Sequence, residues 1–199
     1  MKTMIRSFIA IPLPVEIQLK MEEFARTSNI TQRNGFRPVK ADNIHLTLKF
    51  LGDATPEQIQ SVRGCLAELV QTQRPFRVSF EGIGAFPNWN QPRVIWIGMR
   101  APMELEQLFN AIDRSTVKLG FPSEGRKFSP HLTLARVNAS MGDAQFARVI
   151  QTLRTLAPQP MIGEMTASHL HLYRSDLQPG GPVYSVLSSH PFQGTEVVC

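Results

Sequence analysis

Two segments of the chain alternate strictly between apolar and polar residues, and they share a tetrapeptide. The sequence His-Leu-Thr-Leu occupies positions 45–48 within the segment 43–52, and again positions 131–134 within the segment 127–137. Because side chains alternate across a strand, each segment is predicted to be a strand with His and Thr on one face and leucines on the other. Each copy is followed by a loop and a helical pattern, which suggests an internal duplication.

The remaining pattern predicts further strands and helices between and around these segments. Apolar or alternating runs bounded by Pro, Gly and polar residues predict strands at 7–13, 76–80, 94–99, 165–173 and 183–187. The turn-forming segment 177–182 joins the last two strands. Apolar residues at helical spacing predict helices at 15–26, after Thr55, from Pro102 to near Gly120, and at 146–156. Thr55 with Gln58 forms a predicted capping box, and 27–42 is predicted to be a loop.

This order of elements predicts an α+β fold in two lobes, with a cleft between two mostly antiparallel sheets and helices outside. The 199 residues fit a single domain, 1–199, built from two interleaved lobes. One lobe would carry His45 and the other His131.

Composition narrows the class of protein. Apolar residues make up 42% and charged residues 19%, which excludes a disordered chain. Two cysteines, Cys65 and Cys199, cannot build a disulfide framework, so a reducing cytoplasm is expected. Pro12 and Pro14 interrupt the apolar start of the chain, which is interpreted as a first strand rather than a signal peptide. We expect no membrane association and a monomer.

The two predicted strands carry the candidate chemistry. Histidine titrates near neutral pH, so one ring can act as a general base while the other acts as a general acid. Thr47 and Thr133 supply hydroxyl donors, and Lys49 is predicted to share the face of His45. Arg136 would point away from Thr133 unless a bulge or the strand end turns it. With the net charge of +5, which favours an anionic partner such as nucleic acid, this set suits attack on a phosphodiester without a metal.

Other interpretations of the same residues remain open. The histidines could be structural, or His169 and His171 could form a zinc site with His45 or His131. Of the two tryptophans, the one in the loop, at 89, is a better candidate for stacking on a base than the one at 96, which is expected in the core. The glycines at 82 and 84 are interpreted as a strand irregularity rather than a phosphate loop.

The paired H-x-T-x motifs resemble those of the 2H phosphoesterases. The flanks NIHLTLKFLGD, SPHLTLARV and LYRSDLQPGGPVYSVL are similar to the RNA 2′,3′-cyclic phosphodiesterases, also called 2′-5′ RNA ligases, and the similarity runs almost end to end. One departure is Arg37-Pro38-Val39, where an aromatic residue is expected after the arginine.

The resemblance implies a bilobal fold and hydrolysis of a terminal 2′,3′-cyclic phosphate on RNA to a 2′-phosphomonoester, with no metal or other cofactor. It also implies joining of RNA ends through a 2′-5′ linkage, with tRNA halves as one substrate. The residues leave open which histidine is the acid; the resemblance implies His45 as general acid and His131 as general base. Thr47, Thr133 and Arg136 would bind the phosphate. Lys49 is added to these substrate-binding residues because it is predicted to share the face of His45.

Two other functions fit the same sequence. One is a non-catalytic RNA-binding module with histidines lining its groove. The other is a 2H phosphodiesterase acting on a small cyclic nucleotide, such as a nucleoside cyclic phosphate, or on a 2′-5′ oligonucleotide.

Overall fold

The computed structural model describes residues 4–31, 35–125, 127–138, 144–157, 161–179 and 181–194. Its elements follow one another as β1 (Ile5–Pro12), α1 (Val15–Thr27), β2 (Phe36–Pro38), the 3₁₀ turn η2 (Ala41–Asn43), β3 (His45–Ala54), α2 (Pro56–Leu69), β4 (Phe76–Phe86), β5 (Val94–Arg100), α3 (Met103–Lys118), β6 (Leu132–Val137), α4 (Ala144–Leu156), β7 (Met161–Ala167), β8 (His169–Gln178) and β9 (Gly181–Pro191).

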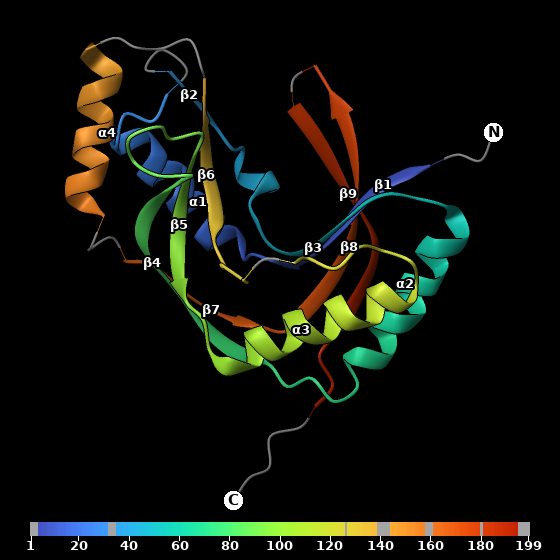
Figure 1. Cartoon of the computed structure of the whole chain (residues 1–199). Coiled ribbons are helices and arrows are strands. Elements are labelled where there is room, and N and C mark those ends of the chain that lie inside the picture. The colour runs from blue at the N-terminus through green and yellow to red at the C-terminus, as the bar shows by residue number, and fades with distance from the viewer. Residues whose placement is uncertain are drawn as a thin grey trace, which may run out of the picture.

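The strands form two antiparallel sheets, as the sequence predicts. One sheet has the order β3-β1-β8-β9, and the other has the order β2-β6-β5-β4-β7. We call them the first and the second sheet, because they hold the first and the second His-Leu-Thr-Leu motif. Figure 1 shows the two sheets diverging, with α4 at the far left and α2 and α3 at the lower right. The chain passes between the sheets repeatedly, so that β1, β3, β8 and β9 build one sheet from both ends of the sequence.

The predicted capping box starts α2. The Thr55 hydroxyl accepts a hydrogen bond from the Gln58 backbone N–H at 3.2 Å, and the Gln58 side-chain oxygen accepts one from the Thr55 N–H at 3.0 Å. Pro56 occupies the first helical position, where its missing N–H costs nothing. This start fixes the direction in which the chain leaves β3.

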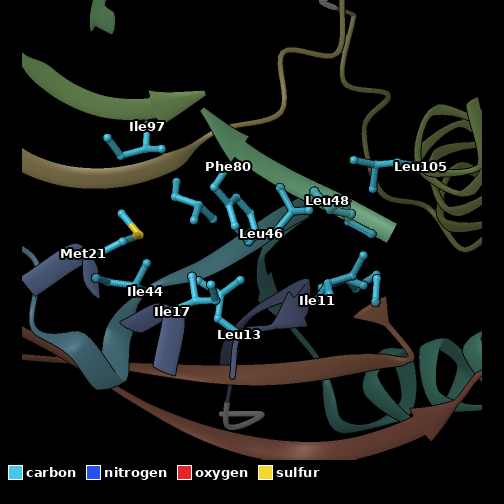
Figure 2. Packing of buried hydrophobic residues seen from close by; sticks show 14 of the residues in the cluster. Ile11, Leu13, Ile17, Met21, Ile44, Leu46, Leu48, Phe80, Ile97 and Leu105 are labelled. Atoms are coloured by element: carbon cyan, nitrogen blue, oxygen red, sulfur yellow. The ribbon is translucent and has the colours of Figure 1, made fainter. Parts of the chain in front are cut away.

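A single apolar cluster joins the two sheets and the helices. It includes Leu46 and Leu48 from β3, Phe80 from β4, Ile97 from β5 and Leu105 from α3 (Figure 2). Burial of one such side chain contributes about 1.5–3 kcal/mol. The leucines of the first motif therefore belong to the core, as the alternating pattern predicts.

Two predictions about elements are wrong. The segment 165–173 is not one strand: β7 pairs with β4 in the second sheet, whereas β8 pairs with β1 in the first. The chain crosses between sheets at Ser168, whose carbonyl accepts a hydrogen bond from the Phe192 N–H. The predicted loop 27–42 contains β2 and η2, because tertiary pairing with β6 orders a polar segment. The predicted hairpin of β8 and β9 is confirmed.

In the part of the chain that the structure describes, no helix combines the length and the apolar character needed to cross a bilayer.

Candidate active site

The first motif occupies β3, which contains a bulge inside the motif. Opposite β1, Thr47 pairs with Ala10 and Lys49 pairs with Ile9, so Leu48 is an extra residue between them. A bulge of this kind reverses the alternation of side chains beyond it. Residues before and after the bulge must therefore be assigned to faces from the pairing rather than from sequence parity.

The pairing with β1 shows which residues share the face of His45. His45 pairs with Pro12, Thr47 with Ala10, and Phe50 with Phe8, and these β1 residues alternate along one side of a regular strand. His45, Thr47 and Phe50 therefore share one face, which we call the first motif face. Strict alternation from Leu46 and Leu48 would place Phe50 in the core, but it is 63% exposed.

Lys49 lies on the opposite side of β3, so the prediction that it shares the face of His45 is wrong. It is only 1% exposed, and its Nζ donates to Asp113 Oδ1 at 2.6 Å and to the carbonyl of Pro122. Asp113 also accepts hydrogen bonds from the Ser123 hydroxyl and the Glu124 N–H. The bulge at Leu48 causes the error, since strict alternation is lost there.

The second motif contains a bulge at the equivalent position. Opposite β5, Thr133 pairs with Trp96 and Arg136 pairs with Val94, which leaves Leu134 as the extra residue. Trp96 and Val94 are two apart on β5, so Thr133 and Arg136 share a face, which we call the second motif face. The bulge that Arg136 needs in order to turn toward Thr133 is therefore present.

Rings from the three other strands of the first sheet surround His45. Phe8 stacks on the imidazole with ring centroids 4.6 Å apart, and Tyr184 meets it edge-on at 5.2 Å. Tyr173 lies 5.8 Å away and stacks on Phe8. Burial lowers the pKa of His45 to about 4, although a hydrogen bond to the Asn43 backbone favours the charged ring and opposes the shift.

His131 precedes β6 by one residue and has its own aromatic neighbours. Its Nδ1 lies 2.7 Å from the carbonyl oxygen of Ser129, which fixes Nδ1 as the N–H donor of the neutral ring. Phe86 meets the ring edge-on at 4.9 Å, and Trp96 lies 6.2 Å away. Both histidines thus hydrogen-bond to the backbone two residues earlier, Asn43 for His45 and Ser129 for His131.

The tryptophans do not lie where the sequence suggests. Trp89 is partly buried and packs against the core, whereas Trp96 lies beside His131. Gly84 makes room for Trp96, since a Cβ on Gly84 would lie 1.9 Å from the indole ring. The left-handed φ of +78° at Gly82, beside a shift in the β4–β5 register, confirms the predicted strand irregularity there, whereas Gly84 pairs in regular register with Trp96.

The two motifs approach each other through the segment that enters β3. Pro38 pairs with Ala135 of β6, and the Val39 N–H donates to the Leu134 carbonyl at 2.9 Å before the chain turns into η2 and β3. Cα atoms of β3 and β6 come within 8 Å of one another. The edge of the first sheet therefore adjoins the second motif.

Electrostatics also link the two motif faces. Burial raises the pKa of Tyr184, and the positive charges of Arg136 and Arg6 oppose this shift. Tyr184 belongs to the first sheet and contacts His45, whereas Arg136 belongs to the second. The field of Arg136 thus extends to the surroundings of His45.

His169 and His171 have hydroxyl partners. His171 Nδ1 lies 3.0 Å from the Tyr173 hydroxyl and its Nε2 lies 2.9 Å from Ser189 Oγ, while His169 Nδ1 lies 2.9 Å from Ser168 Oγ. Among the described residues, no three or more His, Cys, Asp or Glu side chains gather so that they could hold a metal ion. The zinc alternative therefore lacks a ligand set in this part of the chain.

The aromatic neighbours of the histidines were not predicted as site residues. Phe8, Tyr173 and Tyr184 reach His45 from three other strands, and Phe86 reaches His131 from β4. Only the pairing of strands distant in sequence brings them there, so no local pattern could have found them.

Comparison with known proteins identifies the family. The family described as LigT like Phosphoesterase matches the chain twice, over residues 11–96 and 97–184. The chain belongs to this family, the 2H phosphoesterases. Because the two matches lie in tandem, they also support the internal duplication inferred from the two His-Leu-Thr-Leu copies.

Relatives and solved structures match this chain over most of their length. The RNA 2′,3′-cyclic phosphodiesterase of Archaeoglobus fulgidus is 34% identical over 182 residues, covering 92% of this chain and 97% of the relative. The enzyme of the same name from Methanocaldococcus jannaschii is also 34% identical, over 92% and 98% of the two chains. The crystal structure of E. coli LigT complexed with 3′-AMP has a TM-score of 0.76 at 26% identity, covering 96% of this chain and 99% of LigT.

Proposed function

We propose that this protein hydrolyses a 2′,3′-cyclic phosphate at the end of an RNA chain and leaves a 2′-phosphomonoester. The observation that carries the proposal is the matched pair of motifs, in which each histidine is tied to the backbone two residues earlier and each strand bulges after its threonine. The names of the 34% identical relatives support RNA as the substrate.

His131 is assigned as the general base. Its Nδ1–H donates to the Ser129 carbonyl, so the lone pair of the neutral ring is on Nε2. Nε2 would accept a proton from water while the water oxygen forms a bond to phosphorus. The bond between phosphorus and the 3′-oxygen breaks in the same displacement.

His45 is assigned as the general acid that gives a proton to the departing 3′-oxygen. Because the pKa of His45 is about 4 in the free protein, the ring must gain its proton as substrate binds. The negative charge of the phosphate raises the pKa of a nearby histidine. The face of Phe8, stacked on the ring at 4.6 Å, also favours a cation.

Thr47, Thr133 and Arg136 are assigned to the non-bridging oxygens of the phosphate. All three lie on the motif faces, and Arg136 brings the charge that stabilises developing negative charge. Lys49 is left out of this set, because its ammonium group is buried against Asp113 on the other side of β3.

The same groups can transfer the phosphate to a ribose hydroxyl of another RNA in place of water, which would form a 2′-5′ linkage. Water is abundant and RNA ends are dilute, so we propose hydrolysis as the main reaction. Joining of tRNA halves would need both ends to be held at the site.

The experiment that tests the proposal uses an oligoribonucleotide ending in a 2′,3′-cyclic phosphate, with mass and end-group analysis of the product. A 2′-phosphate product supports it, and His45→Ala and His131→Ala should each lower kcat by about 10²–10⁴-fold, the usual contribution of a general acid or base. Binding of the RNA without any product would favour the RNA-binding module instead. Loss of activity after EDTA treatment would contradict a mechanism carried by the histidines alone.

A further inference from the structure

Two arginines lie side by side on the second motif face. Arg37 of β2 is directly opposite Arg136 of β6 in an antiparallel pair. Residues opposite each other share a face and have Cβ atoms about 5 Å apart. Since Arg136 shares the face of Thr133, Arg37 extends this face to the edge strand of the sheet.

The direction of Arg37 is fixed by its neighbour. Phe36 is fully buried and stacks on Phe146 of α4, with ring centroids 5.3 Å apart. Successive side chains of a strand point to opposite faces, so Arg37 must lie on the face away from α4. Arg37 and Arg136 are both exposed there.

Like charges directly opposite each other destabilise a sheet. Among the described residues, the ion pairs include neither Arg37 nor Arg136, whereas Arg77 pairs with Glu164 and Arg100 pairs with Glu81 elsewhere on the same sheet. The repulsion between Arg37 and Arg136 is therefore left for an anionic ligand to neutralise.

One cyclic phosphate supplies too little negative charge for this pair. A 2′,3′-cyclic phosphate is a phosphodiester with a single negative charge, and Arg136 is already assigned to it. An RNA chain carries the next charge on the phosphodiester before its last nucleotide. A guanidinium binds such a phosphate through two parallel N–H donors.

We propose that Arg37 binds the phosphodiester that precedes the cyclic-phosphate nucleotide, so that the protein selects RNA chains over nucleoside cyclic phosphates. This inference rests on the proposed function, and it names the substrate class for the same site. It adds a second anion-binding position beside Arg136.

The test compares two substrates, a trinucleotide ending in a 2′,3′-cyclic phosphate and a nucleoside 2′,3′-cyclic phosphate. In Arg37→Gln the ratio of their kcat/KM values should fall about tenfold or more toward the nucleoside, as expected for a lost hydrogen bond to a charged group. The slope of log(kcat/KM) for the trinucleotide against log salt should become shallower by about 0.7, the value of one phosphate contact on a single strand.

Arg77→Gln serves as the matched control, because Arg77 is exposed on the same sheet but pairs with Glu164. It should keep the substrate ratio and the salt slope of the unmodified protein. An unchanged ratio in Arg37→Gln, or an equal loss on both substrates, would overturn the inference. If the unmodified protein hydrolyses neither substrate, the proposed function itself fails, so the two failures are distinguishable.

Discussion

Lys49 and Asp113 form an ion pair of 2.6 Å between β3 and α3, four residues beyond His45. Asp113 also accepts hydrogen bonds from the Ser123 hydroxyl and the Glu124 N–H, which belong to the segment that leads to the second motif. Further along this segment, Phe128 stacks on Phe109 of α3 at 4.1 Å. The helix α3 thus links the strand that carries His45 to the approach to His131.

This link predicts an asymmetry between the two partners. Asp113→Asn leaves the ammonium of Lys49, which is 1% exposed, without its counter-charge, and we expect a loss of about 3–5 kcal/mol in the free energy of unfolding. Lys49→Met should cost less, because the Asp113 side chain is 18% exposed and keeps two other donors. Urea unfolding of both variants at pH 7 measures the difference. Equal midpoints would contradict the asymmetry.

Acid should weaken the folded state through His45. The unfolded chain binds a proton on this histidine below about pH 6.5, whereas burial keeps the folded ring neutral down to about pH 4. Unfolding therefore takes up a proton in this window, so the free energy of unfolding decreases as pH falls from 6.5 to 4. Above pH 6.5 the ring is neutral in both states, and His45 has no effect on the pH dependence of stability. His171 and His190, whose pKa values are also lowered chiefly by burial, add to the slope in the same direction.

The variant His45→Gln isolates the contribution of His45 to the pH dependence of stability, because glutamine does not titrate. Its free energy of unfolding should fall less steeply between pH 6.5 and 4 than that of the unmodified protein. Urea midpoints at several pH values give both slopes, and parallel slopes would show that His45 is protonated at its ordinary pKa in the fold.

The pH dependence of catalysis should show the pKa of His45 both in the free protein and in the complex with substrate. The pH dependence of kcat/KM reflects the free protein, so the limb on which the rate falls with rising pH, where the general acid His45 loses its proton, should lie near pH 4. The same limb in kcat should lie at higher pH, because bound phosphate raises the pKa of His45. Steady-state rates on a cyclic-phosphate oligonucleotide between pH 3.5 and 9 would show both limbs. If the two limbs coincide, the phosphate does not act on His45.

The periodic pattern was sufficient for most of the fold. Alternation placed Leu46 and Leu48 in the core, and the capping box at Thr55 located the start of α2. The pattern did not predict that the chain passes from the second sheet to the first at Ser168. Two alternating runs follow each other there without a turn signal between them.

The site was predicted in its motif residues but not in its geometry. The bulge at Leu48 removes Lys49 from the face of His45, and the bulge at Leu134 turns Arg136 toward Thr133. A bulge changes which residues share a face without leaving a mark in the alternation of residue types. Its signal is the pairing with a distant strand, which a single sequence does not contain.

The glycine at 84 offers a test of the aromatic support around His131. A methyl group on Gly84 would lie 1.9 Å from the Trp96 indole, far inside van der Waals contact, so the ring must move away from its place beside His131. Gly84→Ala should therefore lower kcat, with a further cost in stability from overpacking of about 1–3 kcal/mol. In Gly64→Ala, on α2, a Cβ meets nothing within 4 Å, so this variant is the matched control and should keep kcat. Rates measured at a temperature where both variants are fully folded separate the two effects. Unchanged kcat in Gly84→Ala would mean that Trp96 does not position His131.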